Sequence, residues 1–244
     1  MRAMVLAAGL GTRLRPLTND RPKALVELGG RTLLEITLTR LASFGVRDVI
    51  INVHHLADMV IEYLRTNNNF GLHVEISRED DLLLDTGGGL KKAAWFFLQD
   101  PARSGEAFLL HNVDAVSSID LARLVKFHNE NQALATLAVQ DRESSRHLLF
   151  NTCGELCGRR VQGQPPEQAR HDGNLQALAF SGIQAISPRL LSRMREDGIF
   201  SIITTYLRLA GEGEKILAFR ADEYYWKDLG RLEDLQEAEK DHAV

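Results

Sequence analysis

The chain has 244 residues, of which 44% are hydrophobic and 25% charged, and its formal net charge at pH 7 is −4. This composition is typical of a soluble globular protein, and the lack of a long basic run argues against nucleic acid as a partner. No stretch is long enough to span a bilayer, the first apolar run is too short for a signal peptide, and the two cysteines make no disulfide framework. The sequence therefore predicts a cytoplasmic protein without a membrane partner.

The first half of the chain alternates short apolar runs with helical patterns. The expected strands cover residues 3–7, 48–53, 72–76, 107–110 and 134–139, and the expected helices cover residues 32–44, 56–64, 88–98 and 120–131. The first helix begins with a capping box formed by Thr32 and Glu35 and stops before Gly45, which suits a left-handed C-terminal cap. Met59 is expected among the apolar positions of the second helix. The repeated order predicts an α/β fold with an open, mostly parallel, Rossmann-like sheet and helices on both faces.

More β structure is expected in the second half. Its expected elements are a hairpin around a turn at residues 151–154, a polar loop or flap over 159–174, a strand over 177–186, two short helices, two short strands near Ala218 and Tyr225, and a charged helix from Leu232. We predict one domain over residues 1–244, with a small β-rich lobe and flap over roughly residues 145–187. No C-terminal β-helix of hexapeptide repeats is expected.

A glycine-bearing loop follows the first strand, within the run LAAGLGTRLRPLTNDRPKAL at residues 6–25. Gly9 and Gly11 allow the backbone to approach a ligand closely, and exposed N–H groups in such a loop form an anion-binding concavity. Arg13 adds a guanidinium that can hold two phosphate oxygens, and Lys23 adds a point charge. An ordinary strand–turn–helix with surface cations is the plainer interpretation of the same pattern.

A dinucleotide-binding loop is a second competing interpretation of the two glycines. Two features argue against it. Arg15 and Pro16 follow at once, where that fold needs an uninterrupted helix, and no acidic residue ends the expected strand at residues 48–53.

The twenty-residue run resembles the signature of the sugar-1-phosphate nucleotidyltransferase superfamily, in which a glycine-rich loop and R-L-x-P-L-T are followed by P-K. The resemblance extends over most of the chain. The resemblance implies that Ala8, Gly9 and Gly11 line a nucleotide, that Arg13 binds the triphosphate, and that Lys23 binds phosphate near the reacting centre.

Two aspartates follow apolar or aromatic strands. Asp114 comes after residues 108–110, at the edge where open α/β sheets bind ligands, and Asp228 lies in YWKDLG at residues 225–230. Each alone suits an ordinary strand-to-loop turn. Together they resemble the two metal-binding aspartates of the family, which implies a Mg²⁺ ion held by both, as one or two carboxylates plus substrate phosphates commonly hold it. The chain departs from the family at Val113, where glycine is usual.

The nucleotide pocket of the family also has a glycine run. Residues 85–89, DTGGG, precede the expected helix over 88–98, and the resemblance implies base and ribose contacts from Gly87 and Gly88. A flexible turn with a helix cap is the alternative. Asn52 ends the second strand, where it either faces the nucleotide or caps the strand.

On the sugar side, residues 180–183, FSGI, resemble a family segment whose glycine approaches the sugar, which implies sugar contacts from Gly182, with Asn112 nearby. Glu155 suits a hairpin turn better than a carboxylate that binds sugar hydroxyls. Many larger relatives carry an E-K-P segment whose lysine holds the sugar phosphate, but residues 163–167 contain no lysine. Arg159, Arg160 and Lys227 are open substitutes.

The expected function is transfer of a nucleoside monophosphate from an NTP, UTP or GTP, to a sugar-1-phosphate, with release of pyrophosphate. Arg13, Lys23 and Asp114 are the expected catalytic residues, with Mg²⁺ at Asp114 and Asp228. The compact chain resembles bacterial mannose-1-phosphate guanylyltransferases and N-acetylmuramate-1-phosphate uridylyltransferases. A non-catalytic sensor of NDP-sugars and a cytidylyltransferase for a polyol phosphate remain as alternatives.

Overall fold

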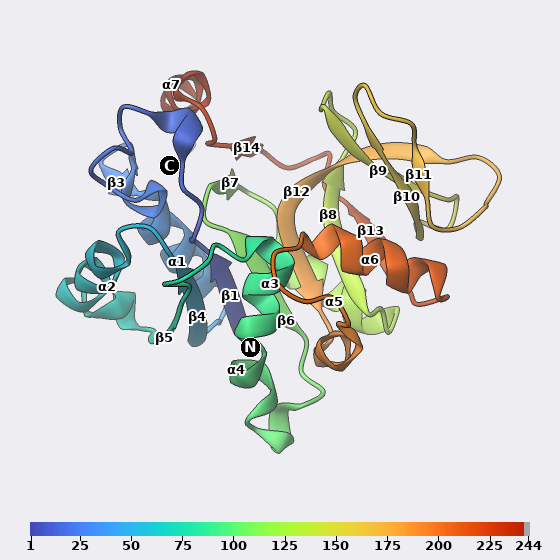
Figure 1. Cartoon of the computed structure of the whole chain (residues 1–244), viewed down its shortest axis with the longest axis horizontal. Helices are drawn as coiled ribbons and strands as arrows, with labels where there is room; N and C mark the ends of the chain where they lie inside the picture. The colour runs from blue at the N-terminus through green and yellow to red at the C-terminus, as the bar shows by residue number, and fades with distance from the viewer. Residues whose placement is uncertain (242–244) are drawn as a thin grey trace.

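The structure, a computed structural model that describes residues 1–241, is built around a ten-stranded mixed sheet (Figure 1). Its main path runs in the order β11 (Glu167–Gln168), β10 (Leu156–Val161), β9 (Arg146–Phe150), β12 (Gln176–Ile186), β6 (Phe108–Asn112), β1 (Arg2–Leu6), β4 (Asp48–Val53) and β5 (His73–Arg78). Off this path, β8 (Ala135–Gln140) pairs with β12 and with β13 (Ile216–Arg220). Two small ladders join β2 (Glu27–Leu28) to β3 (Arg31–Thr32), and β7 (Ala115–Ser117) to β14 (Trp226–Asp228).

Two halves of the sheet differ in strand direction. The strands β6, β1, β4 and β5 are parallel, and in this register Leu6 lies beside both Asn52 and Asn112. The carboxyl ends of these strands therefore meet at one edge of the sheet. β12 is antiparallel to β6, β8 and β9, and it carries the sheet into the hairpin of β9 and β10.

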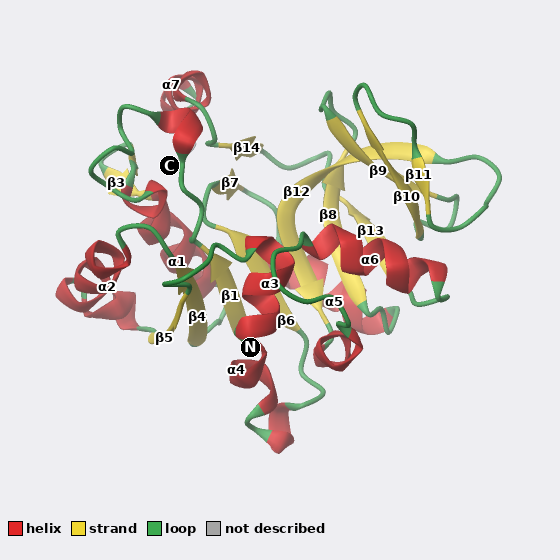
Figure 2. Ribbon diagram, in the orientation of Figure 1, coloured by secondary structure: helices red, strands yellow, loops and turns green. Residues whose placement is uncertain are grey.

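Helices cover both faces of the sheet, as Figure 2 shows. Ala3 and Val5 of β1 belong to one apolar core and Met4 belongs to the other, because successive strand residues face opposite sides. The first core includes residues of α1 (Leu33–Ser43), α2 (Ala57–Thr66), α5 (Leu121–Glu130) and α7 (Leu232–Lys240). The second includes residues of α3 (Asp85–Lys92), α4 (Ala94–Leu98) and α6 (Ile202–Gly211). The predicted α/β fold is confirmed, and within residues 1–241 no helix has the length and apolarity needed to cross a membrane.

The start and end of α1 follow from its sequence. The hydroxyl of Thr32 accepts a hydrogen bond of 3.0 Å from the backbone N–H of Glu35, and Gly45 has the predicted left-handed conformation, with φ of 81°. The reciprocal half of the capping box does not form. The Glu35 carboxylate instead accepts hydrogen bonds from Arg31 and Tyr63, at 3.0 and 3.2 Å.

Three details of the predicted elements are wrong. The helix expected over residues 88–98 begins at Asp85 and breaks at Ala93 into α3 and α4, so the glycine run lies inside a helix. Met59 is 41% exposed, because the apolar stripe of α2 is formed by other residues. The flap expected over residues 159–174 contains the short strand β11, which pairs with β10.

Candidate active site

A cavity of about 340 Å³ opens at the carboxyl edge of the parallel strands. Its walls come from the loop after β1, from the loop after β6 and from the loop after β14. The loop after β1 contributes residues 9–13, and Lys23, Asp114 and Gly230 complete the polar part of the wall. These segments are far apart in sequence and are brought together by the order of the strands in the sheet.

The loop after β1 is folded tightly at Gly11. This residue has φ of +62°, and a Cβ there would lie 2.9 Å from Cγ2 of Thr18 and 3.1 Å from Cβ of Lys23. The Thr18 hydroxyl donates to Gly11 O at 2.8 Å, which closes the loop. Gly9 is different, because a Cβ there would meet nothing within 4 Å. Gly11 is thus required by the fold of the loop, whereas Gly9 borders open space.

Four charged side chains meet in this site. Lys23, whose side chain is 9% exposed, forms an ion pair with Oδ2 of Asp114. Arg13 packs on Gly230, where a Cβ would lie 2.7 Å from Nη2 of the arginine and 3.1 Å from Oδ1 of Asp228. Burial raises the pKa of Asp228, the charge of Asp114 raises it further, and Lys23 and Arg13 act in the opposite direction. Two cations and two carboxylates therefore form one electrostatic cluster.

The pairing of β7 with β14 places the two aspartates side by side. Ala115, next to Asp114, is the partner of Asp228 in this ladder, and the Leu229 N–H donates to Asp114 O at 2.9 Å. Oδ1 of Asp228 is buried without a hydrogen-bond partner in the described part of the chain. No group of three metal-binding side chains occurs in residues 1–241. This donor set fits Mg²⁺, which commonly takes one or two carboxylates together with waters and substrate phosphates.

Asn52 is buried at the end of β4, and both ends of its amide are occupied. Its Oδ1 accepts from the Ala7 N–H at 2.8 Å, and its Nδ2 donates to Oε1 of Glu79 at 2.7 Å. The other oxygen of Glu79 accepts from the Leu84 N–H at 2.9 Å. Asn52 therefore holds the loop after β1, as the strand-capping alternative expects. Ala8 is also buried, directly before Gly9.

Gly87 and Gly88 lie in the first turn of α3, under residues 198–200. A Cβ at Gly87 would lie 2.4 Å from the ring of Phe200, and one at Gly88 would lie 2.4 Å from Gly198 O. The N–H groups of both glycines donate to Phe200 O, at 2.9 and 3.3 Å. Close packing against residues 198–200 is thus a sufficient reason for glycine at both positions, and their contact with a nucleotide stays a prediction.

On the sugar side, a bulge in β12 brings its backbone close to β6. The register of β12 against β8 shifts between Phe180 and Gln184, and Gly182 there has φ of +71°. A Cβ at Gly182 would lie 2.7 Å from Nδ2 of Asn112. The two residues predicted to contact sugar are therefore neighbours.

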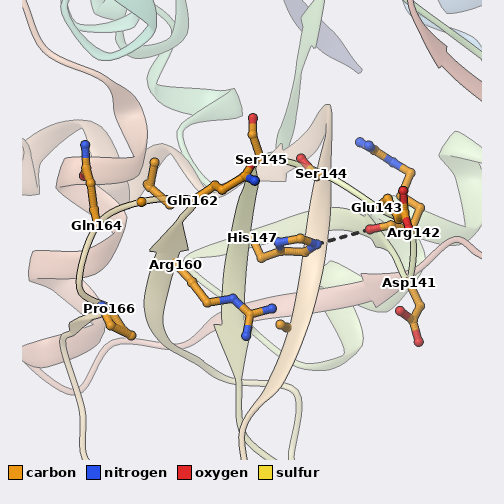
Figure 3. Close-up of a pocket in the computed structure, with 13 residues that line it drawn as sticks. Asp141, Arg142, Glu143, Ser144, Ser145, His147, Arg160, Gln162, Gln164 and Pro166 are labelled. Atoms are coloured by element: carbon orange, nitrogen blue, oxygen red, sulfur yellow. Dashed lines mark hydrogen bonds between the residues drawn. The ribbon is translucent and has the colours of Figure 1, made fainter.

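The candidate cations for the sugar phosphate have different surroundings. Arg159 pairs with Glu167 at 2.6 Å, and Lys227 pairs with the terminal helix region through Glu237 and Asp241, at 3.1 and 3.0 Å. Arg160 has no acidic partner among the described residues and lines a second cavity of about 1140 Å³ (Figure 3).

Glu155 is likewise occupied, because its carboxylate accepts from Arg170 at 3.1 Å and its N–H donates to the side chain of Asn151 at 2.9 Å. Both bonds suit the predicted hairpin turn.

Arg142 lines the second cavity and was not among the residues predicted from the sequence. It follows β8 and lines the cavity of Figure 3, and its guanidinium carbon lies 3.7 Å from the ring centroid of Trp226. Nothing in the sequence near Arg142 indicates this contact, which joins residues far apart along the chain. A cation after a strand is otherwise expected in a solvated loop.

His111 is the titratable group in β6 nearest along the chain to Asp114. Burial lowers its pKa to about 4, and the charge of Arg40 acts in the same direction. Its Nδ1 lies 2.7 Å from Asn112 O, to which it donates. His111 is therefore neutral at pH 7 and is not a proton donor for the site.

Comparisons with known proteins identify the family of the chain. The profile of the nucleotidyl transferase family matches residues 2–148. The chain is 34% identical to the N-acetylmuramate alpha-1-phosphate uridylyltransferase of Caulobacter vibrioides, over 93% of this chain and 91% of that protein. It is 30% identical to the mannose-1-phosphate guanyltransferase of Yarrowia lipolytica, over 96% of this chain and 62% of that protein.

The fold is shared with a putative glucose-1-phosphate thymidylyltransferase of Bacillus anthracis solved with sucrose. The TM-score is 0.79, the identity is 18%, and the match covers 98% of this chain and 94% of that chain. The chain belongs to the nucleotidyl transferase family. The predicted enzyme class, a sugar-1-phosphate nucleotidyltransferase, and its overall reaction of NTP with sugar-1-phosphate are confirmed.

Proposed function

We propose that this enzyme uses UTP, with GTP as the second candidate, and that Arg13, Lys23, Asp114 and Asp228 form its catalytic centre with Mg²⁺. The observation that carries the proposal is that Arg13, Lys23 and Asp114 line the cavity beside Gly9 and Gly11. Asp228 lies directly behind this wall, because its Oδ1 and the Arg13 guanidinium both approach Gly230.

The reaction in this proposal needs no covalent enzyme intermediate. A phosphate oxygen of the sugar-1-phosphate forms a bond to the α-phosphorus of the nucleotide while the bond to the β-phosphate oxygen breaks, and pyrophosphate leaves. Arg13 binds the triphosphate, and Lys23 binds phosphate near the α-phosphorus once it leaves Asp114. Asp114 and Asp228 would hold Mg²⁺, which would supply positive charge where pyrophosphate leaves.

The nucleotide choice rests on the relatives. The uridylyltransferase of Caulobacter vibrioides matches over 91% of its own length, whereas the guanyltransferase of Yarrowia lipolytica matches over 62%. The loop with Gly9 and Gly11 is the proposed nucleotide contact. Residues 145–187 are the proposed sugar-side lobe of a single domain.

The backbone at Gly182 and the amide of Asn112 are the proposed sugar contacts, because β12 comes closest to β6 at this point. Four further residues are proposed to support the nucleotide pocket: Ala8, Asn52, Gly87 and Gly88. Ala8 is buried, and the other three already form hydrogen bonds within the protein.

The experiment that tests this function is pyrophosphate release with Mg²⁺ across UTP, GTP, CTP, ATP and dTTP, each against several sugar-1-phosphates. Strong activity with UTP or GTP and one sugar phosphate is the expected result. Turnover with CTP and a polyol phosphate would favour the cytidylyltransferase alternative. Tight NDP-sugar binding by folded protein without any turnover would favour the sensor.

A further inference from the structure

Arg142 is held in a fixed orientation by two contacts. Its guanidinium stacks on Trp226, with 3.7 Å from the guanidinium carbon to the ring centroid, and its Nη2 donates to Phe180 O at 3.0 Å. Trp226 is fixed in turn, because its indole N–H donates to Ser181 O at 2.7 Å. A guanidinium stacked on an aromatic ring loses little further freedom when it binds a ligand. The group is therefore oriented before any ligand arrives.

The same guanidinium lacks a counter-ion in the protein. No carboxylate in residues 1–241 forms a salt bridge with Arg142, and its Nε is buried without a hydrogen-bond partner. Burial lowers its pKa from the ordinary value of 12.5, while the charge of Asp228 acts in the opposite direction. Arginine side chains keep their proton in folded proteins, so the group is a cation. A partly buried cation with an unused donor is unfavourable unless an anion accepts from it.

The position of Arg142 matches the side of the site where the acceptor must lie. Its partner Phe180 is two residues before Gly182, and its partner Trp226 is two residues before Asp228. Arg142 thus contacts two residues that lie close along their strands to the proposed sugar contact and to a proposed metal ligand. Arg159 and Lys227 are less suited to binding an anion of the acceptor, because each is already paired with carboxylates of the protein.

Arg160 is the other cation that lines the cavity beside Arg142. Figure 3 shows it on β10, across the cavity from the loop that carries Arg142, with His147 between them. Arg160 is exposed, and it makes neither a stacking contact nor a contact with residues 180–182 that would orient it. It is therefore a matched control, with the same residue type in the same cavity but without preorganisation.

We propose that Arg142 binds an oxyanion of the acceptor substrate through the terminal guanidinium N–H groups that Phe180 leaves free. This inference rests on the proposed function and names a residue outside the motifs of the family. The oxyanion has two sources with the same chemistry, the phosphate of the sugar-1-phosphate and a carboxylate carried by the sugar. Either would accept charge-assisted hydrogen bonds from a fixed guanidinium.

Steady-state kinetics test the proposal directly. Arg142→Ala is expected to raise KM for the sugar phosphate roughly 10- to 100-fold and to leave KM for the NTP within about twofold, because a charge-assisted bond to one substrate is lost. Arg142→Lys should recover part of the loss, and Arg160→Ala should change neither KM by more than about twofold. Equal increases in both KM values, or a larger effect of Arg160→Ala, would overturn the proposal.

A competition experiment with two sugar phosphates, only one of which carries a carboxylate, distinguishes the two possible sources of the oxyanion. Glucose-1-phosphate and glucuronic acid-1-phosphate serve as this pair, in competition with the active acceptor. If Arg142 binds phosphate, Arg142→Ala weakens inhibition by both compounds to the same extent. If it binds a sugar carboxylate, the weakening is confined to the glucuronic acid compound. Unchanged inhibition by both compounds contradicts the proposal.

A binding test does not depend on turnover. Trp226 is one of two tryptophans, and the other, Trp95, lies in α4, at the opposite end of the molecule in Figure 1. In a Trp95→Phe background, inorganic phosphate and D-lactate serve as probes for a phosphate and a carboxylate. Binding of either should change Trp226 fluorescence saturably, and a second substitution, Arg142→Gln, should abolish the response. The same titration in Arg13→Gln identifies phosphate bound on the nucleotide side.

The two kinds of failure are then distinct. If no NTP and sugar phosphate give pyrophosphate, the proposed function fails, but loss of the fluorescence response in Arg142→Gln still establishes the anion site. A response that survives in Arg142→Gln and disappears in Arg13→Gln overturns the anion site and leaves the proposed function untouched. If the enzyme is active but its Trp226 fluorescence does not respond to either anion, the proposed anion site is also overturned.

Discussion

The proposed nucleotide side and the proposed sugar side of this enzyme hold their cations in opposite ways. On the nucleotide side, the loop after a parallel strand brings Lys23 against Asp114, so that the cation is neutralised within the protein. On the sugar side, an antiparallel strand with a bulge supports Arg142, which is stacked on Trp226 and has no carboxylate partner in the described chain. Lys23 must therefore leave Asp114 before it can bind a phosphate, whereas Arg142 can bind an anion without first breaking an ion pair.

The largest expected effect is on the nucleotide side. Arg13→Ala or Asp114→Asn should lower kcat/KM by roughly three orders of magnitude or more, because each removes a group proposed to act on the triphosphate or its metal. The fold should persist, as judged by circular dichroism. Arg123→Ala and Asp58→Asn, at exposed surface ion pairs, are matched controls that should retain normal turnover. Near-normal activity in Arg13→Ala would contradict the assignment.

A smaller effect is expected at the bulge on the sugar side. Gly182→Val places a side chain against Asn112 at a backbone with φ of +71°. KM for the sugar phosphate should rise roughly 10-fold or more while KM for the NTP stays constant, because the substitution weakens binding of the sugar phosphate alone. Gly173→Val, where a Cβ meets nothing within 4 Å, is the control. Parallel loss of NTP binding would mean that the two sides are not separable.

Glu196 links α3 to α6. Its backbone carbonyl accepts from Lys91 of α3 at 2.6 Å, and its carboxylate accepts from Arg208 of α6 at 2.7 Å. Burial of Glu196 opposes ionisation, but the hydrogen bonds from Arg208 outweigh it and lower the pKa to about 2. Glu196→Gln should therefore lower the free energy of unfolding at pH 7 by about 1–2 kcal/mol.

The pH dependence of that difference has a definite sign. A carboxyl group with a lowered pKa in the folded state stabilises the protein above its unfolded pKa, and this contribution is lost as pH falls. The difference between wild type and Glu196→Gln should be constant above about pH 4.5 and should disappear towards pH 2. Urea unfolding at pH 7, 4 and 2.5 measures it. A difference that is independent of pH would exclude ionised Glu196 as its cause.

The smallest effects distinguish the two glycines of the loop after β1. Gly11→Ala should destabilise the protein by about 1–2 kcal/mol, because a left-handed backbone disfavours Ala and the new Cβ meets Thr18. Gly9→Ala should leave the melting temperature almost unchanged, since its Cβ enters open space. Any loss of nucleotide affinity in Gly9→Ala then reports contact with ligand. Equal destabilisation by both substitutions would contradict this distinction.

Residues of the site differ in how far they could be predicted from the sequence. The sequence predicts a shared site for the loop after β1, Asp114 and Asp228 because each lies beside a strand end or within a continuous motif, and the fold brings them close together. The start of α3 was missed because the packing of Gly87 depends on Phe200, more than a hundred residues later. Arg142 was missed for the same reason, since its orientation depends on Trp226. Lys227 remained an open candidate because the carboxylates that occupy it lie in and after α7.

The short ladder between β7 and β14 has a consequence for how the enzyme becomes active during synthesis. This ladder places Asp228 beside Asp114, so that half of the carboxylate pair comes from a segment made more than a hundred residues after the other. The parallel strands and the loop after β1 are complete well before that segment leaves the ribosome. A nascent chain that stops before residue 226 contains the loop after β1 and Asp114 but lacks Asp228. Under the proposed assignment of both aspartates to Mg²⁺, catalysis therefore starts only after the late segment has docked.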